Sequence, residues 1–158
     1  MTTEEYVIRL CIQNKMKITC AESCTGGLLA SKLVSVAGAS DCFERSYVTY
    51  SDRAKKEELM VSEETLCKWT AVSGQTAAEM AVGARRRAQA DIALSVTGYA
   101  GPDSGSGEEV GLVYIGCAVK DGVNVQECHF QGTRTQIREQ AADMALHMAL
   151  EQLSAADK

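Results

Sequence analysis

The spacing of apolar residues along this chain changes repeatedly between helical and strand-like patterns. Apolar residues three or four positions apart predict amphipathic helices, and short apolar runs between them predict buried strands. The expected elements are a helix from Thr2 or Thr3, a strand over 17–22, a helix over 25–36, a strand over 46–50, a helix from Ser51 through Leu59, a short helix from Ser62, a long helix from Ser73, strands over 92–96, 111–119 and 123–130, and a last helix after Gly132.

The order of these elements predicts an α/β fold. Early alternation of strands and helices is typical of a parallel sheet with helices on both faces. The turn Lys120-Asp121-Gly122 predicts a hairpin, which requires one antiparallel strand. The run 92–96 is almost entirely apolar, as expected of a central strand. We therefore expect a three-layer α/β/α sandwich around a mixed, mostly parallel five-stranded sheet with one antiparallel strand.

Length and composition indicate an ordinary globular domain. The 158 residues fit a single domain, 1–158, and 46% of them are hydrophobic. No apolar run is long enough to span a membrane, and the N-terminus lacks the pattern of a signal peptide. The net charge of -5 argues against a nucleic-acid partner. We expect a cytoplasmic protein with no membrane partner and no nucleic-acid partner.

The seven cysteines are scattered singly, and no C-x-x-C pair occurs. This pattern predicts neither a zinc site nor a redox pair, and it fits a reducing compartment. Clusters of Asp, Glu and His that would suggest a catalytic metal are also lacking in the sequence. We therefore expect no metal and no other cofactor.

The segment from Ile18 to Gly27, ITCAESCTGG, predicts a strand, a tight turn and the start of a helix. Ser23 lies at the turn, where free N–H groups of the helix would stabilise an oxyanion beside a nucleophilic hydroxyl. A simpler interpretation is that Ser23 or Thr25 caps the helix. Cys24 is a competing nucleophile, because thiol pKa values fall near helix N-termini.

Polar residues follow the carboxyl ends of three expected parallel strands. Besides the turn after the first strand, these are Tyr50 and Ser51, with Lys55 one helical turn later, and then Thr97 and Gly98. Ligands of open α/β sheets bind at this edge. We expect these groups to converge there.

A serine nucleophile needs a base, and the two histidines are poorly placed for it. His129 lies near the end of the last strand, and His147 lies in the final helix on or near its apolar stripe. A Ser-His-Asp triad is therefore not expected. Lys55 is the best-placed alternative, because desolvation lowers the pKa of a lysine. The competing interpretation is a solvated lysine in the charged run 55–58.

Arg134 and Arg138 lie four residues apart and share one helix face. With Gly132 and Thr133 they would hold a phosphate at the helix N-terminus, or they form a solvated face. The Gly-rich loop 98–107 has no Walker pattern. It would hold an anion through its amides or act as a mobile flap.

These motifs together resemble the C-terminal domain of the CinA family, and the likeness covers roughly residues 5–153. The matching segments are Ala21 to Gly27, Tyr50-Ser51 with Lys55, Ala71-Val72-Ser73, Thr97 to Pro102, Val110-Gly111, and Gly132 with Arg134 and Arg138. Two departures from the family pattern are Tyr99, where an aliphatic residue is common, and a shortened loop over 104–109. The pyrophosphatase chemistry of two-domain members is not carried over.

The resemblance implies an α/β/α amidohydrolase without a metal, which converts nicotinamide mononucleotide to nicotinate mononucleotide and ammonia. It implies Ser23 as nucleophile, Lys55 as base and Tyr50 beside them. The groups expected to bind the oxyanion or the substrate are Cys24, Thr25, Gly26, Gly27, Thr97, Gly98, Arg134 and Arg138. We expect a small nucleotide substrate and a homo-oligomer. The alternatives are a non-enzymatic nucleotide-binding module and an amidase for another small amide.

Overall fold

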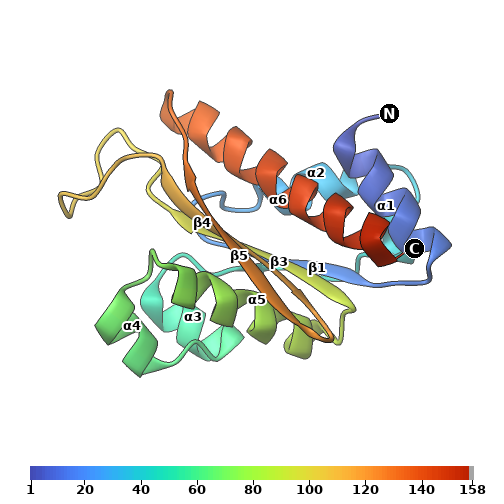
Figure 1. Ribbon diagram of the computed structural model, residues 1–158, viewed down its shortest axis with the longest axis horizontal. Helices are drawn as coiled ribbons and strands as arrows, with labels where there is room; N and C mark the ends of the chain where they lie inside the picture. The colour runs from blue at the N-terminus through green and yellow to red at the C-terminus, as the bar shows by residue number, and fades with distance from the viewer. Residues whose placement is uncertain (157–158) are drawn as a thin grey trace.

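The computed structural model describes residues 1–156, which alternate between helices and strands much as expected (Figure 1). The helices are α1 (Thr3–Gln13), α2 (Leu28–Val34), α3 (Asp52–Leu59), α4 (Glu63–Trp69), α5 (Gly74–Ala88) and α6 (Arg134–Ala156), with a short 3-10 turn η1 (Ala39–Asp41). The strands are β1 (Ile18–Glu22), β2 (Tyr47–Val48), β3 (Ile92–Gly98), β4 (Leu112–Val119) and β5 (Gly122–His129).

The strands form one mixed sheet in the order β2-β1-β3-β4-β5. Strands β2, β1 and β3 are parallel, and β4 runs antiparallel to both of its neighbours. One strand of five therefore points against the others, and the expected sheet is confirmed. Strand β3 is central and its residues 92–97 are buried, as its apolar sequence predicts.

Helices cover both faces of this sheet. Helices α1, α2 and α6 lie on one face, and α3, α4 and α5 lie on the other (Figure 1). Each helical layer buries its own apolar cluster against the sheet, with Leu33 and Leu146 in the first cluster and Met80 and Ala84 in the second. The expected three-layer sandwich is therefore confirmed.

Side-chain caps start several helices where the sequence predicts. Thr2 and Glu5 form the capping box of α1. The hydroxyls of Ser51 and Ser73 accept hydrogen bonds from the third residues of α3 and α5. Among residues 1–156, no helix combines the length and the apolarity needed to cross a membrane.

Helix α3, which carries Lys55, packs closely on α5 at Gly83. A Cβ atom at this position would lie 1.9 Å from the carbonyl oxygen of Leu59, so only glycine permits the contact. This close approach holds α3 beside the carboxyl ends of the parallel strands. The site described below depends on that placement.

Two elements differ from expectation near the site. Helix α2 begins at Leu28, not near Thr25, because Gly26 and Gly27 adopt left-handed φ angles of 56° and 107° and extend the turn. Strand β2 has two residues rather than five, although the Thr49 amide still donates to the carbonyl of Glu22. The turn after β1 is therefore longer and more irregular than its sequence pattern predicts.

Candidate active site

Ser23 and Lys55 meet beyond the carboxyl ends of β1 and β2. The Lys55 Nζ lies 3.0 Å from the Ser23 Oγ and 2.7 Å from the main-chain oxygen of Thr49. Lys55 is only 1% exposed and Ser23 is 9% exposed. The interpretation of Lys55 as a solvated lysine is therefore wrong, because the side chain turns inward from the charged run on α3.

The environment of Lys55 favours its neutral form. Burial lowers the pKa of Lys55 from its usual 10.5, because the ammonium loses its hydration. The negative charge of Asp52 acts in the opposite direction and does not offset the burial. No ion pair within residues 1–156 includes Lys55. A lysine in this state can accept a proton from a neighbouring hydroxyl.

Cys24, the competing nucleophile, is buried and unreactive by comparison. Its side chain is 5% exposed, and burial raises the pKa of its thiol to about 11. The thiol therefore stays protonated at neutral pH, where the thiolate is the reactive form. The expected lowering of its pKa by a helix N-terminus is not found.

Glu22 caps α2, and neither Ser23 nor Thr25 does. The two carboxylate oxygens of Glu22 accept hydrogen bonds from the amides of Leu29, at 2.8 Å, and Ala30, at 3.0 Å. The Ser23 hydroxyl faces Lys55, and the buried Thr25 Oγ1 has no hydrogen-bond partner among residues 1–156. The capping interpretation of Ser23 and Thr25 is therefore wrong.

This assignment of the cap predicts a difference between two isosteric variants. Glu22→Gln should lower the free energy of unfolding by about 2 kcal/mol, because it removes a charged acceptor and leaves one buried helix amide unpaired. Thr25→Val should change it by less than about 0.5 kcal/mol, since its hydroxyl caps nothing. Urea unfolding curves measure both values. An equal loss in the two variants would contradict the assignment.

A pocket of about 250 Å³ opens beside the Ser23–Lys55 pair. Its walls come from the turn after β1, the segments before α3 and α5, the loop after β3 and the first residue of α6. The lining residues are Ser23, Cys24, Tyr50, Lys55, Ala71, Val72, Thr97, Gly98, Tyr99, Ala100, Gly101, Asp103 and Arg134. The expected convergence of the strand ends is therefore present in the structure.

Tyr50 and Arg134 stand together at the rim of this pocket. The Arg134 guanidinium donates one hydrogen bond to the Tyr50 hydroxyl, at 3.2 Å, and another to the carbonyl of Gly101, at 2.6 Å. Tyr50 is 64% exposed. No hydrogen bond within residues 1–156 joins Tyr50 to Ser23 or Lys55, so the tyrosine lies at the mouth of the pocket and not inside the pair.

Thr97 and Gly98 both line the pocket. Thr97 contributes a hydrogen bond from its hydroxyl, and Gly98 contributes close packing that a side chain would prevent. The Thr97 hydroxyl donates to the carbonyl of Ala71 at 2.7 Å, which ties β3 to the segment before α5. A Cβ atom on Gly98 would lie 2.6 Å from a methyl carbon of Val113. Glycine is therefore needed at this strand end for close packing against β4.

Arg138 has other hydrogen-bond partners than Arg134. Its guanidinium donates from Nε to the carbonyl of Cys24, at 2.9 Å, and from Nη2 to the carbonyl of Thr25, at 2.7 Å. Arg138 does not line the pocket, and neither do Thr25, Gly26 and Gly27. The two arginines expected to share one phosphate thus have different neighbours.

Comparison with known proteins places this fold and sequence in one family. The family model described as the CinA C-terminal domain matches residues 1–153. The chain belongs to the CinA C-terminal domain family. A solved structure of a CinA superfamily protein from Klebsiella pneumoniae 700603 superposes with a TM-score of 0.94 at 35% identity, over 97% of this chain and 96% of that one.

In two relatives, the segment that matches this chain makes up different shares of the protein. The nicotinamide-nucleotide amidohydrolase PncC of Enterobacter agglomerans is 52% identical over 135 residues, which are 84% of this chain and 82% of that protein. A CinA-like protein of Kosmotoga olearia is 48% identical over 144 residues, which are 90% of this chain and 35% of that protein. The chain spans about a third of the length of several curated relatives that it matches.

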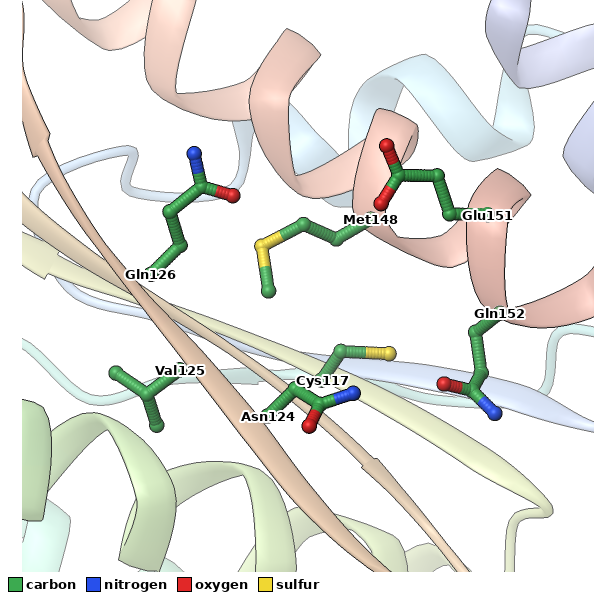
Figure 2. A pocket seen from close by; sticks show the side chains of 7 residues that line it. All are labelled: Cys117, Asn124, Val125, Gln126, Met148, Glu151 and Gln152. Atoms are coloured by element: carbon green, nitrogen blue, oxygen red, sulfur yellow. The ribbon is translucent and has the colours of Figure 1, made fainter.

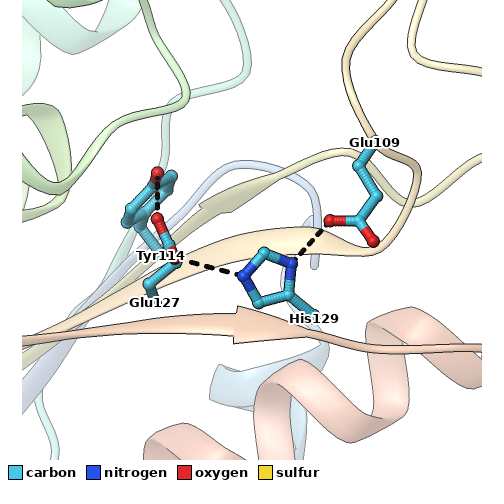
Figure 3. A network of polar contacts seen from close by, with 4 residues as sticks. All are labelled: Glu109, Tyr114, Glu127 and His129. Atoms are coloured by element: carbon cyan, nitrogen blue, oxygen red, sulfur yellow. Dashed lines mark hydrogen bonds and ion pairs between the residues drawn. The ribbon is translucent and has the colours of Figure 1, made fainter.

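Neither histidine of this CinA domain contacts the Ser23–Lys55 pair. His129 lies on β5 between two carboxylates, with Nδ1 2.5 Å from Glu109 and Nε2 3.1 Å from Glu127 (Figure 3). These carboxylates raise the pKa of His129. His147 is exposed on α6, so its expected place near the apolar stripe is wrong.

A wider groove of about 420 Å³ lies between the sheet and the C-terminal half of α6 (Figure 2). Its lining residues are Asn124, Val125 and Gln126 from β5, and Met148, Glu151 and Gln152 from α6. The thiol of Cys117 also lines it, but burial raises the pKa of this thiol to about 12. The groove lacks a nucleophile paired with a base, unlike the pocket at Ser23.

Within residues 1–156, no cluster of three or more His, Cys, Asp or Glu side chains is placed to hold a metal ion.

The sequence does not predict the roles of three groups near the site. Glu22 ends β1 and caps α2 through the amide of Leu29, seven residues later. No sequence pattern distinguishes such a capping carboxylate from one that binds a substrate. Thr49 contributes a main-chain oxygen, which no side-chain pattern indicates. Asp103 lies in the Gly-rich loop and lines the pocket. No sequence pattern around Asp103 predicts that its carboxylate lies there.

Proposed function

We propose that this CinA domain hydrolyses the carboxamide of nicotinamide mononucleotide to nicotinate mononucleotide and ammonia. The observation that carries the proposal is the buried Lys55 amine, 3.0 Å from the Ser23 hydroxyl, at the side of a pocket. A buried lysine with a lowered pKa, joined to a serine, is the arrangement needed to activate a hydroxyl without histidine. The 52% identity with the PncC amidohydrolase supports the substrate.

The reaction begins when neutral Lys55 accepts the proton of Ser23 and the Ser23 oxygen attacks the carboxamide carbon. The carboxamide oxygen becomes an oxyanion, which the amides of Cys24 and Thr25 stabilise. Within residues 1–156, no main-chain oxygen accepts a hydrogen bond from either amide, although the Cys24 N–H contacts its own thiol. When the tetrahedral intermediate collapses, the C–N bond breaks and protonated Lys55, which lies beside Ser23, gives its proton to the departing ammonia.

Water completes the turnover. Lys55, now neutral again, accepts a proton from the water molecule that attacks the acyl group on Ser23. The ester bond breaks, the proton returns to the Ser23 oxygen, and the carboxylate product leaves. Arg134 at the rim is the cation that lines the pocket beside Lys55, and we assign it to the substrate's phosphate together with the amides of the loop after β3.

Ammonia release provides the direct test. The full chain should release one ammonia for each nicotinate mononucleotide formed, at the same rate with and without a chelator, because Ser23 and Lys55 supply the nucleophile and the base. A coupled ammonia assay with product chromatography measures both quantities. Free nicotinamide, glutamine and asparagine serve as competing amides.

The possible outcomes separate the proposal from its alternatives. Turnover of another amide but not of the nucleotide would indicate an amidase with a different substrate. Tight binding of the nucleotide without ammonia would indicate a binding module. Loss of activity on chelation would point to metal-dependent chemistry and contradict the serine–lysine mechanism.

A further inference from the structure

Asp103 brings a negative charge to the pocket beside Ser23. Among the described residues that line this pocket, Asp103 has the one carboxylate, and Lys55 and Arg134 have the groups that can carry positive charge. Burial lowers the pKa of Lys55 and favours its neutral form, whereas a guanidinium stays charged. The pocket therefore holds one lasting negative charge and one lasting positive charge.

Neither of these two charges is neutralised by a neighbouring side chain. No ion pair within residues 1–156 includes Asp103 or Arg134. Arg134 uses its guanidinium on the Tyr50 hydroxyl and the Gly101 carbonyl. In the described chain, no N–H or O–H group donates a hydrogen bond to the Asp103 carboxylate. This carboxylate is therefore free to interact with a molecule in the pocket.

The loop segment that carries Asp103 is tied to elements on both sides of it. The Tyr99 N–H donates to the carbonyl of Leu112 at 3.0 Å, and the Tyr99 carbonyl accepts from the Gly111 N–H at 2.7 Å. Arg134 holds the carbonyl of Gly101, two residues before Asp103. These contacts hold the start of the loop where Asp103 lines the pocket.

Nicotinamide mononucleotide carries two charges of the same kinds. Its ring nitrogen is bonded to ribose, so the pyridinium ring is permanently positive, and its phosphate is negative. With the carboxamide at Ser23 and the phosphate at Arg134, the ring occupies the pocket that Asp103 lines. Opposite charges then meet at both ends of the nucleotide. Free nicotinamide has a neutral ring and gains nothing from the carboxylate.

We propose that Asp103 is a specificity-determining residue, whose carboxylate favours amides on a permanently positive pyridinium ring over amides on a neutral ring. This inference rests on the proposed amidohydrolase function. Asp103 is exposed at the mouth of the pocket, where solvent weakens the attraction between charges. Loss of its charge should therefore weaken binding of the nucleotide by about five- to tenfold.

Reduced nicotinamide mononucleotide is the matched probe, because it keeps the carboxamide, ribose and phosphate but has a neutral ring. Calorimetry on the full chain with Ser23→Ala measures the Kd of both nucleotides without turnover. Adding Asp103→Asn should raise the Kd of the oxidised nucleotide about five- to tenfold and that of the reduced nucleotide less than about twofold. Asp103→Glu, which keeps the charge, should stay closer to the parent than Asp103→Asn does.

Glu108→Gln is the matched control variant. It removes the same charge from the same loop, but Glu108 does not line the pocket, so both Kd values should match those of the parent. A rise of both Kd values in Asp103→Asn by the same factor would mean that the carboxylate binds the shared ribose hydroxyls, and the role in sensing ring charge would be overturned. Unchanged Kd values in Asp103→Asn would overturn it as well.

Failure of this inference is separable from failure of the proposed function. With Ser23 present, Asp103→Asn should raise KM for nicotinamide mononucleotide and leave kcat nearly unchanged, because the ring charge is the same before and during the reaction. If the wild type releases ammonia and Asp103→Asn does so with equal kcat and KM, only the role of Asp103 is overturned. If the wild type neither releases ammonia from the nucleotide nor binds it, the proposed function fails and this inference fails with it.

Discussion

Replacing Ser23 with alanine should abolish ammonia release from nicotinamide mononucleotide and leave the domain folded. The variant has no hydroxyl to form the acyl-enzyme, and kcat should fall by a factor on the order of 10⁴ or more. The structural cost is small, because one hydrogen bond from Lys55 is lost and the lysine keeps the Thr49 carbonyl. We expect the free energy of unfolding to change by about 1 kcal/mol.

Cys24→Ala is the matched control for this prediction. Cys24 is adjacent to Ser23 and lines the same pocket, but burial raises its thiol pKa to about 11. The variant should therefore keep kcat within about tenfold of the wild type, since a protonated thiol is not the attacking group. An inactive Cys24→Ala protein beside an active Ser23→Ala protein would reverse the assignment of the nucleophile.

Most of the fold could be predicted because its signals are local and strong. The apolar run 92–96 indicates a central strand, and Asp121-Gly122 indicates the hairpin that reverses β4. The weaker predictions concern short elements whose ends depend on tertiary contacts. The two-residue β2 and the late start of α2 at Leu28 follow from the shape of the turn around Gly26 and Gly27, which apolar spacing does not encode.

In the candidate site too, the sequence predicts which segments meet, but it does not predict the tertiary contacts of single side chains. The topology of parallel strand ends indicates where Ser23, Lys55 and Tyr50 gather. The burial of Lys55 is invisible in the charged run around it, because it depends on α3 packing against α5 at Gly83. The partners of Arg138 are equally invisible, because they are main-chain carbonyls more than a hundred residues away.

Replacing Lys55 should have the second large effect on turnover. Lys55→Ala removes the base, and kcat should fall by about 10²–10⁴-fold. Lys55→Arg keeps the positive charge but cannot accept a proton near neutral pH, so it should be nearly as inactive. Ammonia release by the two purified variants measures both losses. High activity in Lys55→Arg would show that the charge, and not proton transfer, is what the reaction needs.

Lys56→Ala is the control for these variants. Lys56 is the next residue on α3, but its amine pairs with Glu63 at 3.6 Å and its side chain is 39% exposed. Its removal should leave kcat and KM close to wild type, because an exposed ion pair contributes little to stability. A large loss in this variant would mean that disturbance of α3, rather than loss of a base, explains the effect at Lys55.

The pH dependence of kcat/KM tests the base by a different route. Only neutral Lys55 accepts a proton, so kcat/KM should rise as pH rises through the lowered pKa of Lys55 and then level off. The negative charge of Asp52 raises this pKa against the effect of burial. Asp52→Asn should therefore lower the pKa further and shift the rising limb to lower pH.

A shift of the pH profile distinguishes an effect on Lys55 from partial unfolding better than a loss of rate does. Asp52→Asn should make the enzyme more active on the acid side of the limb, whereas partial unfolding lowers activity at every pH. Glu57→Gln removes a carboxylate from the same helix, but Glu57 pairs with Arg53, so this variant should leave the limb in place. If Asp52→Asn leaves the limb unmoved or shifts it to higher pH, the group that titrates is not Lys55.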